Sequence, residues 1–126
     1  MLSYTKAFSG FSVDDLQKAK KFYGEIIGLK VIDDPMGLIE LETEGNNNIL
    51  VYPKPNHIPA TFTILNFVID NIDETVEALH EKGIIFEQYD EPIKTDQKGI
   101  CRNPNGPNIA WFKDPAGNIL SIIEEK

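Results

Sequence analysis

Few side chains in this sequence could act as a general base, a nucleophile or an anion clamp. The two histidines, His57 and His80, have no partner at a metal-binding spacing, and we interpret both as ordinary residues. Cys101 would need a neighbouring cation to act as a thiolate nucleophile, and the alternative is a small thiol packed in a strand. Arg102, the single arginine, could contact an anion, and the alternative is a surface ion pair. These residues therefore do not indicate a particular reaction.

Three glutamates alternate along one segment. Glu40, Glu42 and Glu44 would lie on one face of a strand, opposite Leu41. Three carboxylates on one face could hold a cation, and a solvated sheet face is the alternative. The sequence has no glycine-rich phosphate loop. The carboxylates therefore give no specific signal for catalysis.

Charge and composition exclude several classes of partner. A chain of 126 residues with 41% apolar residues can bury one main core. The formal net charge of −8 disfavours nucleic acid and anionic lipid as partners. No stretch reaches the roughly 20 apolar residues of a membrane helix. A single cysteine forms no internal disulfide, so we expect a cytoplasmic protein.

The elements that must position these residues repeat along the chain. Residues 11–16 (FSVDDL) resemble residues 67–72 (FVIDNI), 56 residues later. Gly28 and Gly83, which follow the two segments, are 55 residues apart. The spacing is about half the chain, so we interpret the sequence as a duplicated module.

Each copy predicts a strand that leads into a helix. Apolar residues at helical spacing predict helices over 15–27 and 72–82, with Asp14 and Asn71 as the residues that cap their first turns. Strand-like runs follow each helix, at 29–33, 37–43, 48–53, 84–90, 98–102, 108–113 and 118–124. Three prolines in 53–60 predict a linker. We therefore expect one domain, 1–126, made of modules 1–55 and 60–126.

Two segments carry a resemblance to a known family. Residues 11–23 (FSVDDLQKAKKFY) with Gly28-Leu29, and residues 110–120 (AWFKDPAGNIL), resemble the vicinal oxygen chelate superfamily. That superfamily includes glyoxalase I, bleomycin-resistance proteins and extradiol dioxygenases. The resemblance covers nearly the whole chain. It implies an α+β fold of two βαβββ modules that pair into an open cup, with helices outside, a small-molecule ligand inside, and a homodimer.

Metal-using members of this superfamily place four ligands in the cup. Carried onto this sequence, the four positions fall on Phe8, near Leu50, near Ile64 and on Ser121. None is a histidine or a carboxylate, which are the donors that a divalent metal needs. We therefore expect no metal and no cofactor.

The same resemblance suggests which residues line the cup. Strand alternation places Ser12 on the face of Phe8, and Asn66 on the face of Ile64. Large aromatic residues near the expected cup strands are core residues or pocket walls. The ligand-pocket candidates are Phe8, Ser12, Leu50, Tyr52, Phe62, Ile64, Asn66, Trp111 and Ser121, with Arg102 as an anion contact.

Three functions stay open at this stage. The first is a metal-free protein that binds a small, partly apolar molecule in the cup. The second is a metal-dependent lyase, isomerase or dioxygenase, which would need ligands outside the four positions. The third is an interaction module in which the dimer itself is the functional unit. The sequence leaves enzymatic activity undecided and names no catalytic residue.

Overall fold

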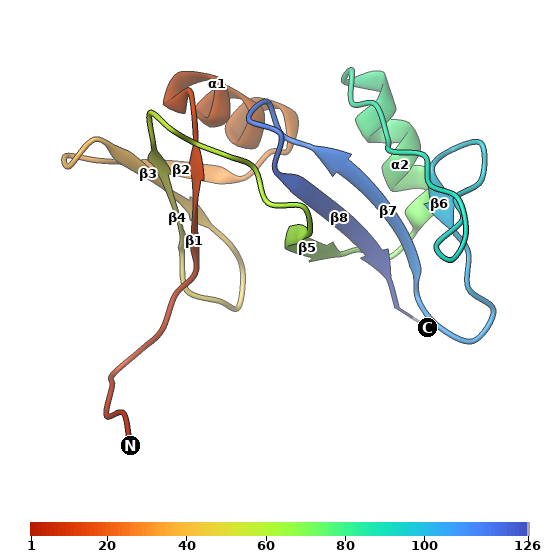
Figure 1. Cartoon of the computed structure of the whole chain (residues 1–126), viewed down its shortest axis with the longest axis horizontal. Helices are drawn as coiled ribbons and strands as arrows, with labels where there is room; N and C mark the ends of the chain where they lie inside the picture. The colour runs from red at the N-terminus through yellow and green to blue at the C-terminus, as the bar shows by residue number, and fades with distance from the viewer. Residues whose placement is uncertain (126) are drawn as a thin grey trace. The chain divides into compact units, whose positions relative to one another are not determined.

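The computed structural model describes residues 1–125, and the chain divides into two compact units (Figure 1). The first unit is Met1–Pro59 and the second begins at Ala60. The first contains β1 (Gly10–Val13), α1 (Leu16–Lys21), the π-helical segment η1 (Phe22–Ile26), β2 (Lys30–Asp34), β3 (Leu38–Glu42) and β4 (Ile49–Pro53). The second contains β5 (Thr63–Val68), α2 (Ile72–Glu81), β6 (Ile100–Cys101), β7 (Asn108–Lys113) and β8 (Ile119–Glu124).

Each unit folds its strands into one four-stranded sheet with the same topology. The strand orders are β1-β4-β3-β2 and β5-β8-β7-β6. In each sheet the first strand pairs in parallel with the last, and the other neighbours pair antiparallel. The same βαβββ order therefore occurs twice, which confirms the predicted α+β architecture.

The first helix begins one residue later than predicted. The capping residue is Asp15 rather than Asp14: its backbone is extended, and its carboxylate accepts a hydrogen bond from the Lys18 N–H at 3.1 Å. The predicted cap of α2 is correct, because the Asn71 side chain accepts from the Glu74 N–H at 3.1 Å. Both side chains satisfy an N–H group that has no partner within its helix.

The predicted helix over 15–27 changes form halfway. Its α-helical part ends at Lys21, and η1 continues with wider turns, in which the Ile27 N–H donates to the Phe22 carbonyl at 2.9 Å. Phe22 and Tyr23 are adjacent and both buried, with ring centroids 5.1 Å apart. A widened turn allows two consecutive large side chains to reach the same core.

Both sheets bury one face against their helix. In the first unit Val13, Ile39 and Leu41 are buried, whereas the alternate residues of the same strands are more exposed. In the second unit Phe112 on β7 is buried in the same way, whereas β8 buries Leu120, Ser121 and Ile122 in succession. The period of two therefore leaves the first sheet with a second, open face. No helix in the described part of the chain is long and apolar enough to cross a membrane.

The segment 84–90 is not a strand, although the sequence predicted one. Ile84 and Phe86 are buried and Ile85 is exposed, which is the alternation that suggested a strand. The segment meets β7 where the Glu87 N–H donates to the Trp111 carbonyl at 2.8 Å. The adjacent part of the same edge of β7 is paired with β6, which is shorter than predicted. Burial alternates here without a continuous ladder of hydrogen bonds.

Candidate functional site

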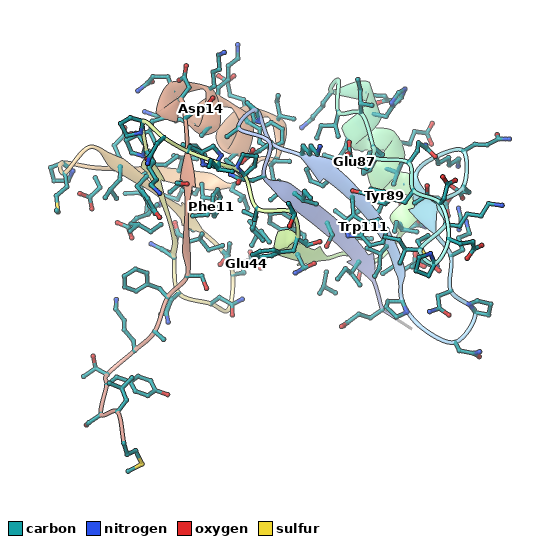
Figure 2. The ribbon with its side chains drawn as sticks, in the orientation of Figure 1. Phe11, Asp14, Glu44, Glu87, Tyr89 and Trp111 are labelled. Atoms are coloured by element: carbon teal, nitrogen blue, oxygen red, sulfur yellow. The ribbon has the colours of Figure 1, made fainter. Side chains whose placement is uncertain are left out.

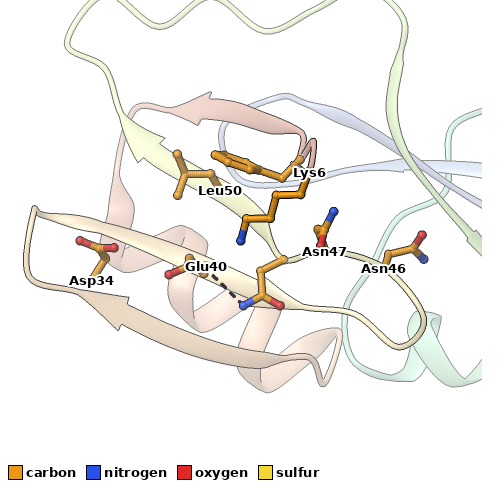
Figure 3. A pocket seen from close by; sticks show the side chains of 8 residues that line it. Lys6, Asp34, Glu40, Asn46, Asn47 and Leu50 are labelled. Carbon is orange, nitrogen blue, oxygen red and sulfur yellow. Dashed lines mark hydrogen bonds between the residues drawn. The ribbon is translucent and has the colours of Figure 1, made fainter. Parts of the chain in front are cut away.

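A pocket of about 420 Å³ lies on the open face of the first sheet (Figure 3). Its walls are Lys6 and Phe8 before β1, Asp34 at the end of β2, Glu40 on β3, the asparagines at 46–48, and Leu50 on β4. The pocket combines an apolar surface with hydrogen-bonding and charged groups. This mixture is typical of small-molecule sites.

The strand register brings the central residues of the pocket together. Glu40 pairs with Leu50 across β3 and β4, so their side chains emerge side by side on one face. Asp34 pairs with Leu38, which is two residues before Glu40 on β3. Because Ile39 and Leu41 are buried on the helix side, Glu40 is directed to the open face. The alternation that builds the core therefore also positions this carboxylate.

The segment before β1 is fixed to the sheet beside the pocket. The Asn47 side-chain amide donates to the Ala7 carbonyl. The Leu50 N–H donates to the Ser9 carbonyl at 3.0 Å. These two bonds anchor the residues on either side of Phe8, whose side chain is 58% exposed. Asn47 thus holds one wall of the pocket in place.

Two of the nine predicted pocket residues, Phe8 and Leu50, line this pocket. Ser12 and Tyr52 pair across β1 and β4 on the same sheet but do not line it. Ser12 is instead within 2.7 Å of His57 Nδ1, measured from its hydroxyl oxygen. This contact connects His57, in the segment after β4, to Ser12 on β1. His57 therefore has a structural contact, in agreement with our interpretation of it as an ordinary residue.

The other predicted pocket residues belong to the second unit. Asn66 and Ser121 pair across β5 and β8, and the Ser121 hydroxyl, which is buried, donates to the Asn66 side chain. Ile64 lies where the pairing of β5 with β8 shifts by one residue. Phe62 precedes β5 and is 67% exposed. These residues lie in a different unit from the described pocket, and their role in ligand binding stays a prediction.

Trp111, the remaining candidate, packs against Tyr89 (Figure 2). Their ring centroids are 5.5 Å apart in a tilted, edge-on arrangement. Burial raises the pKa of Tyr89, and the nearby charge of Glu87 raises it further. Trp111 is half-buried, so part of its surface on β7 stays accessible. This accessible part is compatible with contact to a ligand.

Arg102 is engaged by two carboxylates. Its Nη2 atom is 2.6 Å from Asp73 Oδ1, and its Nε atom is 3.0 Å from Asp96 Oδ2. The Arg102 hydrogen bond, with weaker help from Lys98, lowers the pKa of Asp73 despite some burial. Burial opposes the shift at Asp96, but the Ile100 N–H and Arg102 lower its pKa overall. The geometry is that of the surface ion pair that we kept as the alternative to an anion contact.

We expect Arg102→Gln to weaken the acid dependence of stability. Both aspartates have a lowered folded pKa, so their ion pairs stabilise the chain above about pH 4, the value in unfolded chains, and lose that effect as the pH falls. Because the charged groups are largely exposed, the variant should lose at most about 1 kcal/mol of unfolding free energy near neutral pH. Urea unfolding at neutral and acid pH measures both effects. Lys94→Gln is the control, since Lys94 forms no ion pair in the described chain, and equal pH dependence in the two variants would contradict the assignment.

The positions that carry metal ligands in the superfamily do not fit a metal here. Phe8 and Leu50 offer no donor atom, and the Ser121 hydroxyl is already hydrogen-bonded to Asn66. Within residues 1–125, no three histidine, cysteine, aspartate or glutamate side chains are placed to hold an ion. A divalent metal requires three or four converging donors.

Sequence reasoning missed most of the polar wall of the pocket. The asparagines at 46–48 were not among the predicted pocket residues, and Lys6 and Asp34 belong to no motif. Glu40 was noticed as part of an alternating series, but the series divides in the structure. Glu40 lines the pocket, whereas Glu42 is 3.5 Å from Lys30 and Glu44 lies beyond β3. A search for polar residues opposite the expected ligand positions could have found Glu40.

Comparisons with known proteins agree with the fold. Residues 7–122 match the Glyoxalase/Bleomycin resistance protein/Dioxygenase superfamily. The uncharacterized protein YwkD of Bacillus subtilis is 28% identical over 124 residues, which cover 88% of this chain and 89% of YwkD. TnmS3, an antibiotic binding protein from Streptomyces sp. CB03234, is 23% identical with a TM-score of 0.70, covering 99% of this chain and 100% of TnmS3. Lactoylglutathione lyase from Agrobacterium tumefaciens is also 23% identical, with a TM-score of 0.68 and coverages of 97% and 94%.

Together the repeated module, the motif segments and the match over 7–122 define a vicinal oxygen chelate fold. The chain belongs to the Glyoxalase/Bleomycin resistance protein/Dioxygenase superfamily. The two solved structures share its fold, although one is an antibiotic binding protein and the other a lyase. The fold therefore does not decide between binding and catalysis.

Proposed function

We propose that this protein binds a small, partly apolar molecule without a metal. The observation that carries the proposal is that Phe8 and Leu50 line a pocket, and the resemblance places them at or near two positions of metal ligands in metal-using relatives. Apolar side chains at these positions remove metal chemistry and supply a hydrophobic surface. The existence of an antibiotic binding protein with the same fold supports binding as a sufficient function. The polar wall would orient the bound molecule.

A fragment screen tests the proposal directly. Titration of the isotopically labelled chain, observed by nuclear magnetic resonance, should reveal compounds that shift the amide signals of β3 and β4. Leu50→Trp should abolish their binding by filling the pocket. Val68→Trp, on the 62% exposed Val68 of β5, adds the same side chain to the other sheet and should leave binding unchanged. Loss of binding in the Val68 variant alone would place the ligand elsewhere and contradict the proposal.

We expect the purified protein to carry less than one catalytic metal per chain. The reason is the absence of donors at Phe8 and Leu50, together with the engaged hydroxyl of Ser121. Elemental analysis after dialysis measures the metal content. Added zinc, nickel or iron should not raise the melting temperature, since a ligand stabilises only the state that binds it. A tight metal at one per chain, removed by a chelator with loss of stability, would favour the lyase, isomerase or dioxygenase alternative.

We also propose a cytoplasmic homodimer. Each sheet ends in edge strands, β1 and β2 in one and β5 and β6 in the other, and edges of this kind favour association. Light scattering should give a mass near twice the 14.2 kDa of one chain. A mass of one chain at micromolar concentration would contradict this part of the proposal, and also the interaction-module alternative.

A further inference from the structure

The carboxylates on β2 and β3 differ in whether they have a basic partner. Asp33 is 2.8 Å from the Lys20 ammonium, and Glu42 is 3.5 Å from that of Lys30. Asp34 and Glu40 lie on the same two strands, yet neither forms an ion pair with any residue from 1 to 125. These two are also the carboxylates that line the pocket. The pocket therefore contains the acidic groups of these strands that are left without a cation.

The existing contacts of the two carboxylates leave room for a further donor. Glu40 Oε1 accepts a long hydrogen bond of 3.4 Å from the Asn48 side-chain amide, drawn as a dashed line in Figure 3. One oxygen of Asp34 accepts from the Met36 N–H at 2.8 Å. An ionised carboxylate offers about four acceptor positions, so each retains capacity for a charged donor.

The register places the two carboxylates within reach of one ligand. Asp34 pairs with Leu38, and Glu40 is two residues farther along β3, so Asp34 and Glu40 are diagonal neighbours on one face. Diagonal neighbours in an antiparallel pair are about 7–8 Å apart. A single ammonium group between them could donate hydrogen bonds to both carboxylates, because the two side chains span part of that distance.

The neighbouring wall is apolar and would suit the rest of such a ligand. Leu50 is directly opposite Glu40 in the register, and Phe8 lines the same pocket. A calcium or magnesium ion would need about six or more oxygen ligands, and the apolar wall supplies none. An organic cation, in contrast, can pair its charge with the carboxylates and bury its apolar part against the apolar wall.

We propose that the preferred ligand is a small organic ammonium ion, with its ammonium at Asp34 and Glu40 and its apolar body on Leu50 and Phe8. This inference rests on the proposed binding function and adds the charge class of the ligand. The net charge of −8 also attracts cations to the protein surface, which favours a cationic ligand. Lys6 is the one basic residue on the pocket wall, and its ammonium would compete with that of the ligand for the carboxylates.

Three probes of matched shape and different charge test the proposal. These are 3-phenylpropylamine, which is cationic, 3-phenyl-1-propanol, which is neutral, and 3-phenylpropanoate, which is anionic. Each is titrated into the labelled full chain and followed by amide signals of β3 and β4. We expect the amine to bind about tenfold more tightly than the alcohol, because a charged donor on a carboxylate forms a stronger hydrogen bond. The propanoate should bind most weakly.

Two matched variants assign the effect. Glu40→Gln keeps the size of the side chain but removes its charge, so it should remove the advantage of the amine over the alcohol. Glu42→Gln changes a glutamate on the same face of β3 that is paired with Lys30 and lies outside the pocket, so the advantage should persist. Lys6→Gln should increase the affinity for the amine.

The outcomes separate this inference from the proposed function. If the alcohol binds at the pocket as tightly as the amine, or if Glu40→Gln leaves the preference intact, the charge class is wrong and pocket binding stands. If none of the three probes shifts the signals of β3 and β4, the ammonium proposal is overturned. The fragment screen with Leu50→Trp then decides the proposed function independently.

Discussion

A chain with Phe112→Ala is expected to lose about 3–5 kcal/mol of unfolding free energy. The Phe112 side chain is fully buried on the helix-facing side of β7, and its ring centroid is 5.6 Å from that of Phe86. Removing the ring deletes its buried apolar contacts and leaves a cavity that the surrounding strands fill only in part. Urea unfolding, followed by circular dichroism, measures the loss.

Trp111→Ala is the matched control, one residue earlier in the same strand. Trp111 faces the other side of the sheet, is only half-buried, and forms a ring pair with Tyr89. Its removal should cost less than about 2 kcal/mol, because much of its surface already contacts water and the lost ring pair contributes about 0.5–1.5 kcal/mol. Equal losses in the two variants would mean that the faces of β7 are assigned incorrectly.

These two neighbours illustrate what the sequence could predict. The strand over 108–113 was predicted with the bounds that β7 has, and the repeat correctly predicted the same module twice. Both predictions rest on periodicity and on spacing, which the sequence displays directly. The register of β7 with β8 determines which of the two adjacent aromatic residues faces the helix. The sequence pattern alone does not show this register.

The two incorrect secondary-structure predictions, the strand over 84–90 and the uninterrupted helix over 15–27, share a physical cause. Residues 84–90 alternate in burial as a strand does, but their backbone has little room on the edge of β7 that β6 also uses. The helix over 15–27 has α-helical spacing in its first half, but two adjacent aromatic residues enter the core at η1. In both places tertiary packing, rather than local spacing, determined the backbone hydrogen bonds.

The candidate site was predictable only in part for the same reason. Phe8 and Leu50 could be predicted from the resemblance, because Phe8 lies two residues before β1 and Leu50 lies on β4. The polar wall depends on contacts outside strands, such as the Asn47 side chain that binds the Ala7 carbonyl 40 residues away. Local patterns carry no information about such a pairing. Glu40 was ambiguous because an exposed face and a pocket wall have the same alternation.

The second large expected effect concerns the turn between β7 and β8. Asp114 is 5% exposed and begins the turn between β7 and β8. Its Oδ1 atom accepts from the N–H groups of Ala116 and Asn118, both at 2.9 Å, and its Oδ2 atom accepts from the Asn118 side-chain amide at 3.0 Å. Gly117 completes the turn with a φ of 86°, a conformation that favours glycine. One carboxylate thus satisfies three donors in a buried turn.

Asp114→Ala should lower the free energy of unfolding by about 2–4 kcal/mol, because it leaves buried N–H groups without acceptors. The chain provides its own control in the turn between β2 and β3. That turn has the sequence Asp34-Pro35-Met36-Gly37. The Asp34 Oδ1 atom accepts a hydrogen bond from the Met36 N–H at 2.8 Å, and this bond is exposed to solvent. Asp34→Ala should therefore cost less than about 1 kcal/mol, since water can replace the lost acceptor. Urea unfolding of both variants checks the prediction, and a similar cost for the two would show that the turn itself, rather than its burial, determines the stabilisation.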